Sequence, residues 1–214
     1  MDNHRRHFIK SASLLVLSFP AAVLTAQRSN SRALVGGGCD GCEGIYDGLP
    51  KQMHWQTSIA AATEPGEPLE ISGVIFKSDG KTPAPDVLLY VYHTDAKGDY
   101  SPAPGTTGNA RRHGHLRGWM KTNVRGEYKF TTTKPAPYPN GLIPAHIHPV
   151  VKEPDKNEYY LDAYHFDGDP LLTAAERARS ENRGGSGIIR LSRAAGTWIG
   201  RRDLVLGLNI PNYR

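Results

Sequence analysis

Residues 69–76 read Leu-Glu-Ile-Ser-Gly-Val-Ile-Phe, an alternation of apolar and polar side chains that is typical of a strand with one buried face. A polar turn, Ser78-Asp79-Gly80-Lys81, follows this stretch. The next apolar run, residues 87–93, reads Val-Leu-Leu-Tyr-Val-Tyr-His, and its β-branched and aromatic side chains suit a pleated sheet. The two runs therefore predict neighbouring strands of a sheet.

The same pattern recurs along the chain. We expect further strands over residues 116–122, 127–133, 145–151, 187–192 and 203–209, most of them bounded by Gly, Pro or Asn. Helical composition is confined to residues 171–179, which follow Pro170. Seven strands and one short helix predict an all-β fold, an antiparallel β-sandwich with long loops.

Length and charge limit the alternatives. The chain has 214 residues, of which 38% are hydrophobic, enough for one well-buried domain and too few for two of full size. We assign residues 69–214 to that domain and residues 27–68, which are polar and rich in glycine, to an arm lying over it. The net charge is +5, but the positive charges are scattered among 21 carboxylates, so no nucleic-acid partner is expected.

The first 26 residues have the pattern of an export signal. Arg5-Arg6-His7-Phe8-Ile9-Lys10 precedes the uncharged residues 11–26, and this order resembles a twin-arginine signal, whose pathway exports folded proteins. The alternative is a membrane anchor, but Ser18 and Pro20 interrupt a stretch already shorter than the roughly 20 apolar residues of a spanning helix. We therefore expect a periplasmic or extracellular protein with no stable membrane span after processing.

Cys39 and Cys42 are the only two cysteines. Two thiols exclude a four-cysteine zinc or iron–sulfur site within one chain. In an oxidising compartment the pair is expected to form a short-loop disulfide in the arm. A free redox pair and a lipidated Cys39 remain as alternatives.

One pair of histidines has the spacing of metal ligands. His146 and His148 are two positions apart in an expected strand, so both imidazoles point to one face while Ile147 points to the other. The pattern also occurs in His113-Gly114-His115, so spacing alone is weak support. Two tyrosines strengthen the first pair: Tyr138 between prolines, and Tyr100 shortly after a strand.

These residues lie within a longer resemblance. Over residues 69–172 the chain resembles the intradiol ring-cleavage dioxygenases, the catechol and protocatechuate 3,4-dioxygenase family. The motifs are Ile71-Ser72-Gly73-Val74, Val91-Tyr92-His93-Thr94-Asp95, Gly98-Asp99-Tyr100, Arg117-Gly118-Trp119, Gly126-Glu127-Tyr128-Lys129-Phe130, Pro137-Tyr138-Pro139, Pro144-Ala145-His146-Ile147-His148 and Phe166-Asp167-Gly168-Asp169-Pro170-Leu171. The resemblance implies that Tyr100, Tyr138, His146 and His148 hold a ferric ion.

The chemistry of the four side chains agrees with this expectation, because two phenolates and one hydroxide neutralise Fe(III). The resemblance implies a substrate, a catechol-type aromatic diol, that is cleaved with O2 between its two hydroxylated carbons. It also implies catalytic roles for Tyr100 and Tyr138, with Tyr138 leaving the iron to act as a base. A homodimer is expected from the same resemblance.

Two positions depart from the family pattern. Ile143 stands where the family has an arginine, and Ala163 stands where it has a glutamine. We hypothesise that the basic loop of residues 111–117, which contains Arg111, Arg112 and Arg117, supplies the missing cation. The alternative for this loop is a solvated surface segment.

Two other functions remain open from the sequence. The strands also resemble non-enzymatic transthyretin-like binding modules, which need no set of two tyrosines and two histidines. A family member that binds iron without cleaving rings is the second alternative. Tyr92 and His93 are expected on opposite faces of a strand, and Trp119 and Trp198 are expected in the core.

Overall fold

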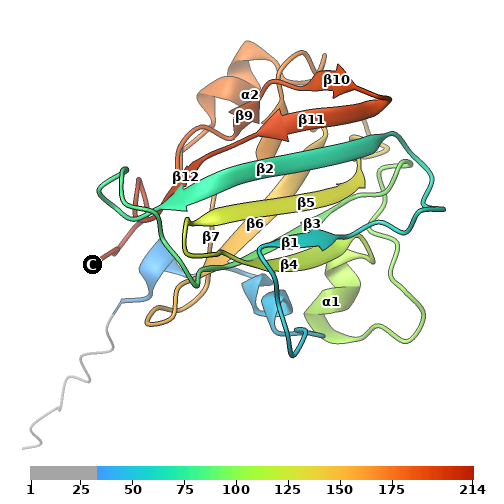
Figure 1. Ribbon diagram of the computed structural model, residues 1–214. Helices are drawn as coiled ribbons and strands as arrows, with labels where there is room; N and C mark the ends of the chain where they lie inside the picture. The colour runs from blue at the N-terminus through green and yellow to red at the C-terminus, as the bar shows by residue number, and fades with distance from the viewer. Residues whose placement is uncertain (1–32) are drawn as a thin grey trace, which may run out of the picture. The chain divides into compact units, whose positions relative to one another are not determined.

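The computed structural model describes residues 33–214, and the predicted export signal at residues 1–26 lies outside them. The described residues form two β-sheets that pack face to face, as Figure 1 shows. The predicted all-β sandwich is confirmed.

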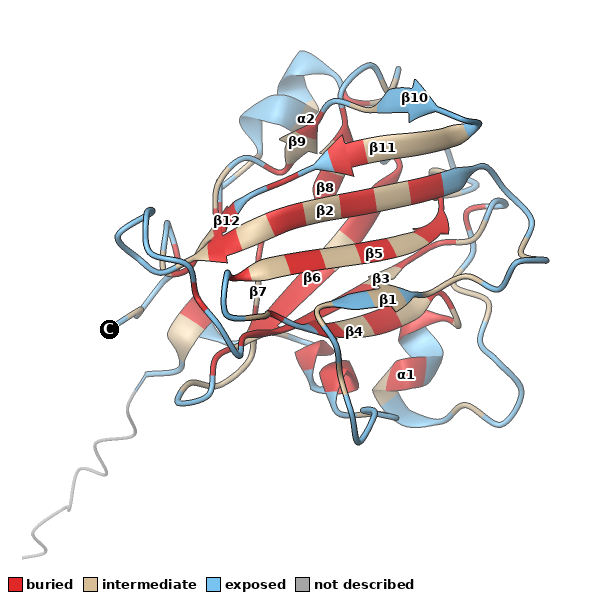
Figure 2. Cartoon of the chain, in the orientation of Figure 1, coloured by how far each residue is buried: buried red, intermediate tan, exposed pale blue. Residues whose placement is uncertain are grey.

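The first sheet has the order β1-β5-β2-β11-β10, and β12 pairs with β2 beyond β11. Alternation explains its central strand, because Leu69, Ile71 and Ile75 are at most 1% exposed while residues 70, 72 and 74, on the other face, are less buried (Figure 2). Its strands are β1 (Gln56–Ser58), β2 (Pro68–Phe76), β5 (Glu127–Thr133), β10 (Ser192–Ala194), β11 (Thr197–Arg201) and β12 (Leu204–Val205).

The second sheet has the order β4-β3-β6-β8-β9, with β7 paired to β6. On β3, Leu89 and Val91 point into the core between the sheets, whereas Tyr90 belongs to a second apolar cluster on the outer face. The strands are β3 (Leu88–His93), β4 (Arg117–Lys121), β6 (His146–Lys152), β7 (Tyr159–Tyr160), β8 (Tyr164–Phe166) and β9 (Ile188–Ile189).

Pairing differs from the expectation in four places. The pairs β1–β5, β11–β2, β12–β2 and β8–β9 are parallel, so both sheets are mixed. The expected strand 187–192 is divided between β9 and the start of β10, and the expected strand 203–209 is reduced to β12. Strand β11 was not predicted. It contains Gly200, where a Cβ would lie 2.7 Å from the Cδ1 of Ile71, and a glycine weakens the sequence pattern of a strand.

Helices are short. The helix α2 (Ala174–Ala178) lies within the predicted range 171–179. A second helix, α1 (Gly108–His113), corrects the expectation of a single one. Its N-cap residue, Thr107, forms no side-chain capping hydrogen bond; instead the Asp47 carboxylate, distant in sequence, accepts a hydrogen bond from the Ala110 backbone N–H at 2.9 Å.

The arm covers the outer face of the second sheet. It contains two 3-10 turns, η1 (Val35–Gly37) and η2 (Cys42–Ile45), and the expected disulfide joins Cys39 to Cys42. Cys42 and Ile45 are buried in one cluster with Tyr90. Strand β1 of the arm pairs with β5 of the first sheet.

Both tryptophans expected in the core pack against apolar clusters while staying partly exposed. Trp119 packs on the outer cluster and donates a 2.7 Å hydrogen bond from Nε1 to the carbonyl of Ile45, and Trp198 packs on the main core. Across residues 33–214, no helix has the length and apolarity needed to cross a membrane.

Candidate metal centre

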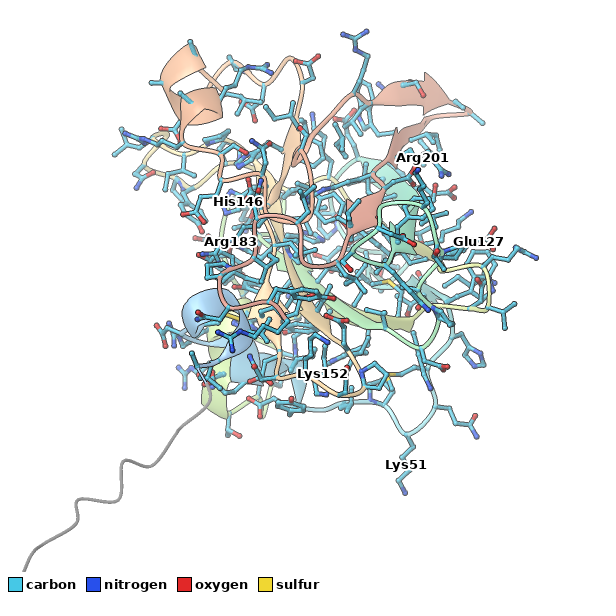
Figure 3. All side chains as sticks on the ribbon, turned by 90° about the vertical axis from the view of Figure 1, so that its left-hand side faces the viewer. Lys51, Glu127, His146, Lys152, Arg183 and Arg201 are labelled. Carbon is cyan, nitrogen blue, oxygen red and sulfur yellow. A yellow bond between two sulfur atoms is a disulfide. The ribbon has the colours of Figure 1, made fainter. Side chains whose placement is uncertain are left out.

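Strand β6 presents two histidines on the outer face of the second sheet. Ile147 is fully buried in the core, and His146 and His148 on either side of it point the other way. Their Nε2 atoms lie 2.9 Å apart (His146 is labelled in Figure 3). The Nδ1 of His146 donates to the carbonyl of Pro144 at 2.7 Å, which leaves a lone pair on its Nε2. This tautomer is the one that binds a metal through Nε2.

The two tyrosines lie on loops that are joined to each other. Tyr100 follows β3 and Tyr138 lies between β5 and β6. The Thr94 hydroxyl donates to the carbonyl of Ala136 at 2.7 Å, which ties the start of one loop to the other. Gly98, with φ +87°, allows the contact, since a Cβ there would lie 2.1 Å from the carbonyl oxygen of Pro137. The backbone thus places both phenols on the same side of the sheet.

The four polar atoms converge. The Tyr100 and Tyr138 hydroxyl oxygens are 3.1 Å apart, and the Tyr138 oxygen is 3.4 Å from the Nε2 of His146. Ligands bound at about 2.0–2.2 Å to one ion, at angles of about 90–110°, lie about 3 Å from each other. The contacts among Tyr100, Tyr138, His146 and His148 therefore match a shared first-row metal ion.

The electrostatics of the site also favour a cation. Burial raises the pKa of the Tyr100 phenol far above its usual range, and the hydrogen bond with Tyr138 raises it further. Burial lowers the pKa of His146 and of His148, so both imidazoles are neutral at pH 7. Without a cation the Tyr100 side chain is therefore a neutral phenol, and a bound ion would supply the positive charge that a buried phenolate needs.

The donor set decides which ion fits. Among the described residues, no group of three or more His, Cys, Asp or Glu side chains could hold a metal, so the tyrosines are needed to complete a four-atom set. Two phenolates are hard anionic ligands, and together with two imidazoles they suit a trivalent ion better than zinc or copper. The residues present fit the ferric ion that the sequence predicts.

Tyr92 stacks against the site, whereas the sequence analysis predicted only that it lies on the opposite face of its strand from His93. Its ring lies against that of His148, its partner in the β3–β6 register. His93 points to the opposite face, as expected, where its ring nitrogens contact the Thr94 carbonyl and the Thr132 hydroxyl, each at 2.8 Å. Only the pairing of β3 with β6 shows that Tyr92 and His148 meet.

Within residues 33–214, the arginines of the basic loop of residues 111–117 form no hydrogen bond with the four polar atoms. Arg112 forms an ion pair with Asp40 at 2.9 Å, and Arg117 donates to the carbonyl of Asp47 at 2.6 Å. The loop contacts the arm instead. These contacts do not support the hypothesis that the loop supplies a cation to the site.

A pocket of about 310 Å³ opens beside His148 and passes Ala163 and His165. Ala163, at the position of the family glutamine, is part of its wall, whereas Ile143, at the position of the family arginine, is 40% exposed. His165 was missed by the sequence analysis, because its place beside His146 follows from strand pairing alone.

Known proteins resemble this chain. A family model described as Dioxygenase matches residues 46–196. Catechol 1,2-dioxygenase 1 of Acinetobacter lwoffii is 30% identical over 162 residues, which are 62% of this chain and 51% of that protein. Catechol 1,2-dioxygenase 2 of the same organism is 27% identical over 157 residues, 60% of this chain and 55% of that protein. The chain thus spans about half the length of the curated relatives it matches.

Solved structures share the fold. The dioxygenase domain of a dioxygenase carbohydrate-binding protein fusion from Streptomyces sp. SirexAA-E superimposes with a TM-score of 0.53 at 24% identity, covering 74% of this chain and 91% of that one. Catechol 1,2-dioxygenase from Acinetobacter sp. ADP1 gives 0.52 at 20% identity, covering 72% and 57%. With the family model matched over most of the sandwich, the chain belongs to the intradiol ring-cleavage dioxygenase family.

Proposed function

We propose that the protein is a ferric dioxygenase that cleaves a catechol-type aromatic diol between its two hydroxylated carbons with O2. One observation carries the proposal: the oxygens of Tyr100 and Tyr138 and the Nε2 atoms of His146 and His148 form a chain of contacts between 2.9 and 3.4 Å. Family membership and the catechol dioxygenases among its relatives support the reaction type.

The protein residues have distinct tasks. Tyr100, Tyr138, His146 and His148 would hold the iron, which would supply the redox chemistry between the diol and O2. Tyr138 is placed to take a proton from a hydroxyl of the diol at its Oη, because that oxygen lies between Tyr100 and His146 on a loop without regular secondary structure. Tyr100, whose backbone lies close to Gly114, serves as the phenol ligand that stays in place.

Metal content and the visible spectrum of the purified protein test the proposal together with oxygen uptake in the presence of catechol. We expect one iron per chain, a tyrosinate-to-iron charge-transfer band and catechol-dependent oxygen consumption. Tyr100→Phe should remove or strongly shift the band. Tyr46→Phe is the matched control, because the Tyr46 hydroxyl contacts Glu158 at the surface and lies outside the site.

Each alternative predicts a different result. A colourless protein that binds no iron after reconstitution contradicts the proposal and supports the alternative, a non-enzymatic transthyretin-like binding module. An iron-loaded protein that shows the charge-transfer band but consumes no oxygen with any catechol supports the other alternative, a family member that binds iron without cleaving rings.

We also propose that the protein is exported to the periplasm or beyond. The support is the twin-arginine pattern at Arg5-Arg6 and the disulfide between Cys39 and Cys42, since disulfides persist in oxidising compartments. Expression in a bacterial host should give a processed protein in the periplasmic fraction. Arg5→Lys combined with Arg6→Lys should retain it in the cytoplasm.

A further inference from the structure

His165 lies next to the metal centre but outside the four-atom set. On β8 it is directly opposite His146 of β6, so both side chains point to the outer face of the sheet. Its neighbours Tyr164 and Phe166 point into the core. The rings of His165 and His146 have centroids 5.8 Å apart. The imidazole therefore borders the site without joining its ligands.

Neither ring nitrogen of His165 has a hydrogen-bond partner within residues 33–214, and its Nδ1 is buried. The three buried histidines differ in this respect. His93 bonds to Thr94 and Thr132, His113 contacts the Tyr90 hydroxyl, and His146 bonds to Pro144. Because buried polar atoms normally find partners, an unpaired imidazole beside a reactive centre indicates a ligand that completes its bonding.

The surrounding pocket has room for such a ligand. Its volume is about 310 Å³, whereas an apolar cavity of about 150 Å³ already admits benzene. An aromatic ring bearing a substituent therefore fits. Ala163 points to the same face as His165, two residues earlier, and its small side chain leaves the imidazole uncovered.

Most other polar groups in the wall are already paired. Arg177 bonds to Asp167, Arg179 to Glu176, and Ser180 to Asp162. Among the wall residues, His165 and Tyr160 are the two whose side chains form no hydrogen bond within residues 33–214, and His165 is the one that lies opposite the candidate ligand His146. A neutral imidazole offers one donor and one acceptor.

We propose that His165 is a specificity-determining residue that hydrogen-bonds a polar substituent on the ring of the diol, so that the enzyme prefers catechols bearing a hydroxyl-type substituent. This inference rests on the proposed function. The four ligand side chains come from β6 and two loops, and His165 is one strand further along the sheet. Its reach is therefore to a substituent rather than to the two hydroxyls of the diol that bind the metal.

Matched substrates test this role. Ethylcatechol and hydroxymethylcatechol differ by one methyl-to-hydroxyl exchange, and each is used with the substituent at ring position 3 and at position 4. Calorimetry under anaerobic conditions gives the Kd of each diol for the iron-loaded protein, and oxygen uptake gives kcat/KM. One hydrogen bond of typical strength corresponds to a preference of about tenfold for the hydroxymethyl compound at one of the two positions.

Variants assign the preference to His165. His165→Phe should abolish it in the Kd ratio and in the kcat/KM ratio, and His165→Gln, which keeps a donor and an acceptor, should restore part of it. His54→Phe is the matched control, since His54 is exposed and is not part of the pocket wall. Circular dichroism and thermal unfolding verify that each variant is folded.

The outcomes separate the two hypotheses. A preference that survives His165→Phe, no preference in the parent protein, or no measurable binding of either diol overturns the role of His165. If His165→Phe does not fold, a lack of preference in the parent protein still overturns the role, and a preference that His165→Gln leaves at its full parental value does so as well. A preference that depends on His165 in the binding data, without oxygen uptake, supports the role and contradicts the proposed ring cleavage.

Discussion

The ring of Tyr92 lies nearly parallel to that of His148, with centroids 4.7 Å apart and 17° between the ring planes. Tyr92 also stacks on His113, at 3.7 Å and 9°. His113 is held in turn by a 2.9 Å contact between its Nδ1 and the hydroxyl of Tyr90. The orientation of one candidate ligand is therefore set by a stack of aromatic rings reaching to α1.

Removing the ring of Tyr92 should weaken metal binding without touching a ligand. Groups that orient a ligand typically change metal affinity by about 10–100-fold, and deleting a large aromatic side chain costs about 3–5 kcal/mol of stability. We expect both effects for Tyr92→Ala. Tyr92→Phe keeps the stack, so its iron affinity and its free energy of unfolding should be near those of the parent protein. Iron titration and urea unfolding measure them; equal iron affinity in all three proteins would show that the stack is unimportant.

Gly98→Ala should separate the two tyrosine loops. The added Cβ would lie 2.1 Å from the Pro137 carbonyl oxygen at φ +87°, so we expect a loss of at least about 1–3 kcal/mol of stability and weaker iron binding. Gly80→Ala is the control for backbone strain alone, because Gly80 also has positive φ but no atom within 4 Å of its Cβ position. Similar effects of the two substitutions on iron binding would contradict the close contact.

Tyr100→Phe should separate metal binding from stability. In the metal-free protein the Tyr100 hydroxyl contacts only Tyr138 among the described residues, so its removal should change the unfolding free energy by less than about 1 kcal/mol. Tyr128→Phe is the contrast, because its buried hydroxyl donates to the Arg202 carbonyl at 2.6 Å and contacts the Tyr164 hydroxyl at 2.9 Å. We expect a cost of about 1–3 kcal/mol there and unchanged iron content. A larger loss for Tyr100→Phe would mean that the phenol is structural.

Acid should destabilise the protein through His93. Burial lowers its pKa from 6.5 to about 4, so the folded protein favours the neutral ring. The stabilisation is complete above pH 6.5 and declines as the pH falls toward 4, because the unfolded chain binds the proton first. The full shift corresponds to about 3 kcal/mol. Urea unfolding at several pH values should show a shallower decline for His93→Gln, and parallel curves would contradict the assignment.

The parts of the fold that the sequence predicts are those with local alternation. Strands β2, β3 and β5 lie within or next to the ranges read from residues 69–76, 87–93 and 127–133. The family motifs in the sequence also predicted that Tyr100 and Tyr138 lie together with the two histidines. In each case the information lies in a short segment.

The remainder depends on partners distant in sequence. The first turn of helix α1 is capped by the Asp47 carboxylate, which is distant in sequence. Strand β11 pairs with β2, but a glycine within it weakens the apolar alternation that would predict a strand. His165 meets His146 only through the register of β8 on β6. No periodicity within a segment can show which strand becomes its neighbour.

The attachment of the arm has a consequence for the order of events during synthesis. The Gly36 N–H donates to the carbonyl of Pro211, and its carbonyl accepts from Arg183. This part of the arm leaves the ribosome before either partner exists, so η1 can dock only when almost the entire chain has been made, whereas η2 and β1 contact residues that are made much earlier. A nascent chain stalled before Arg183 would therefore have its arm attached at η2 and β1 and unattached at η1.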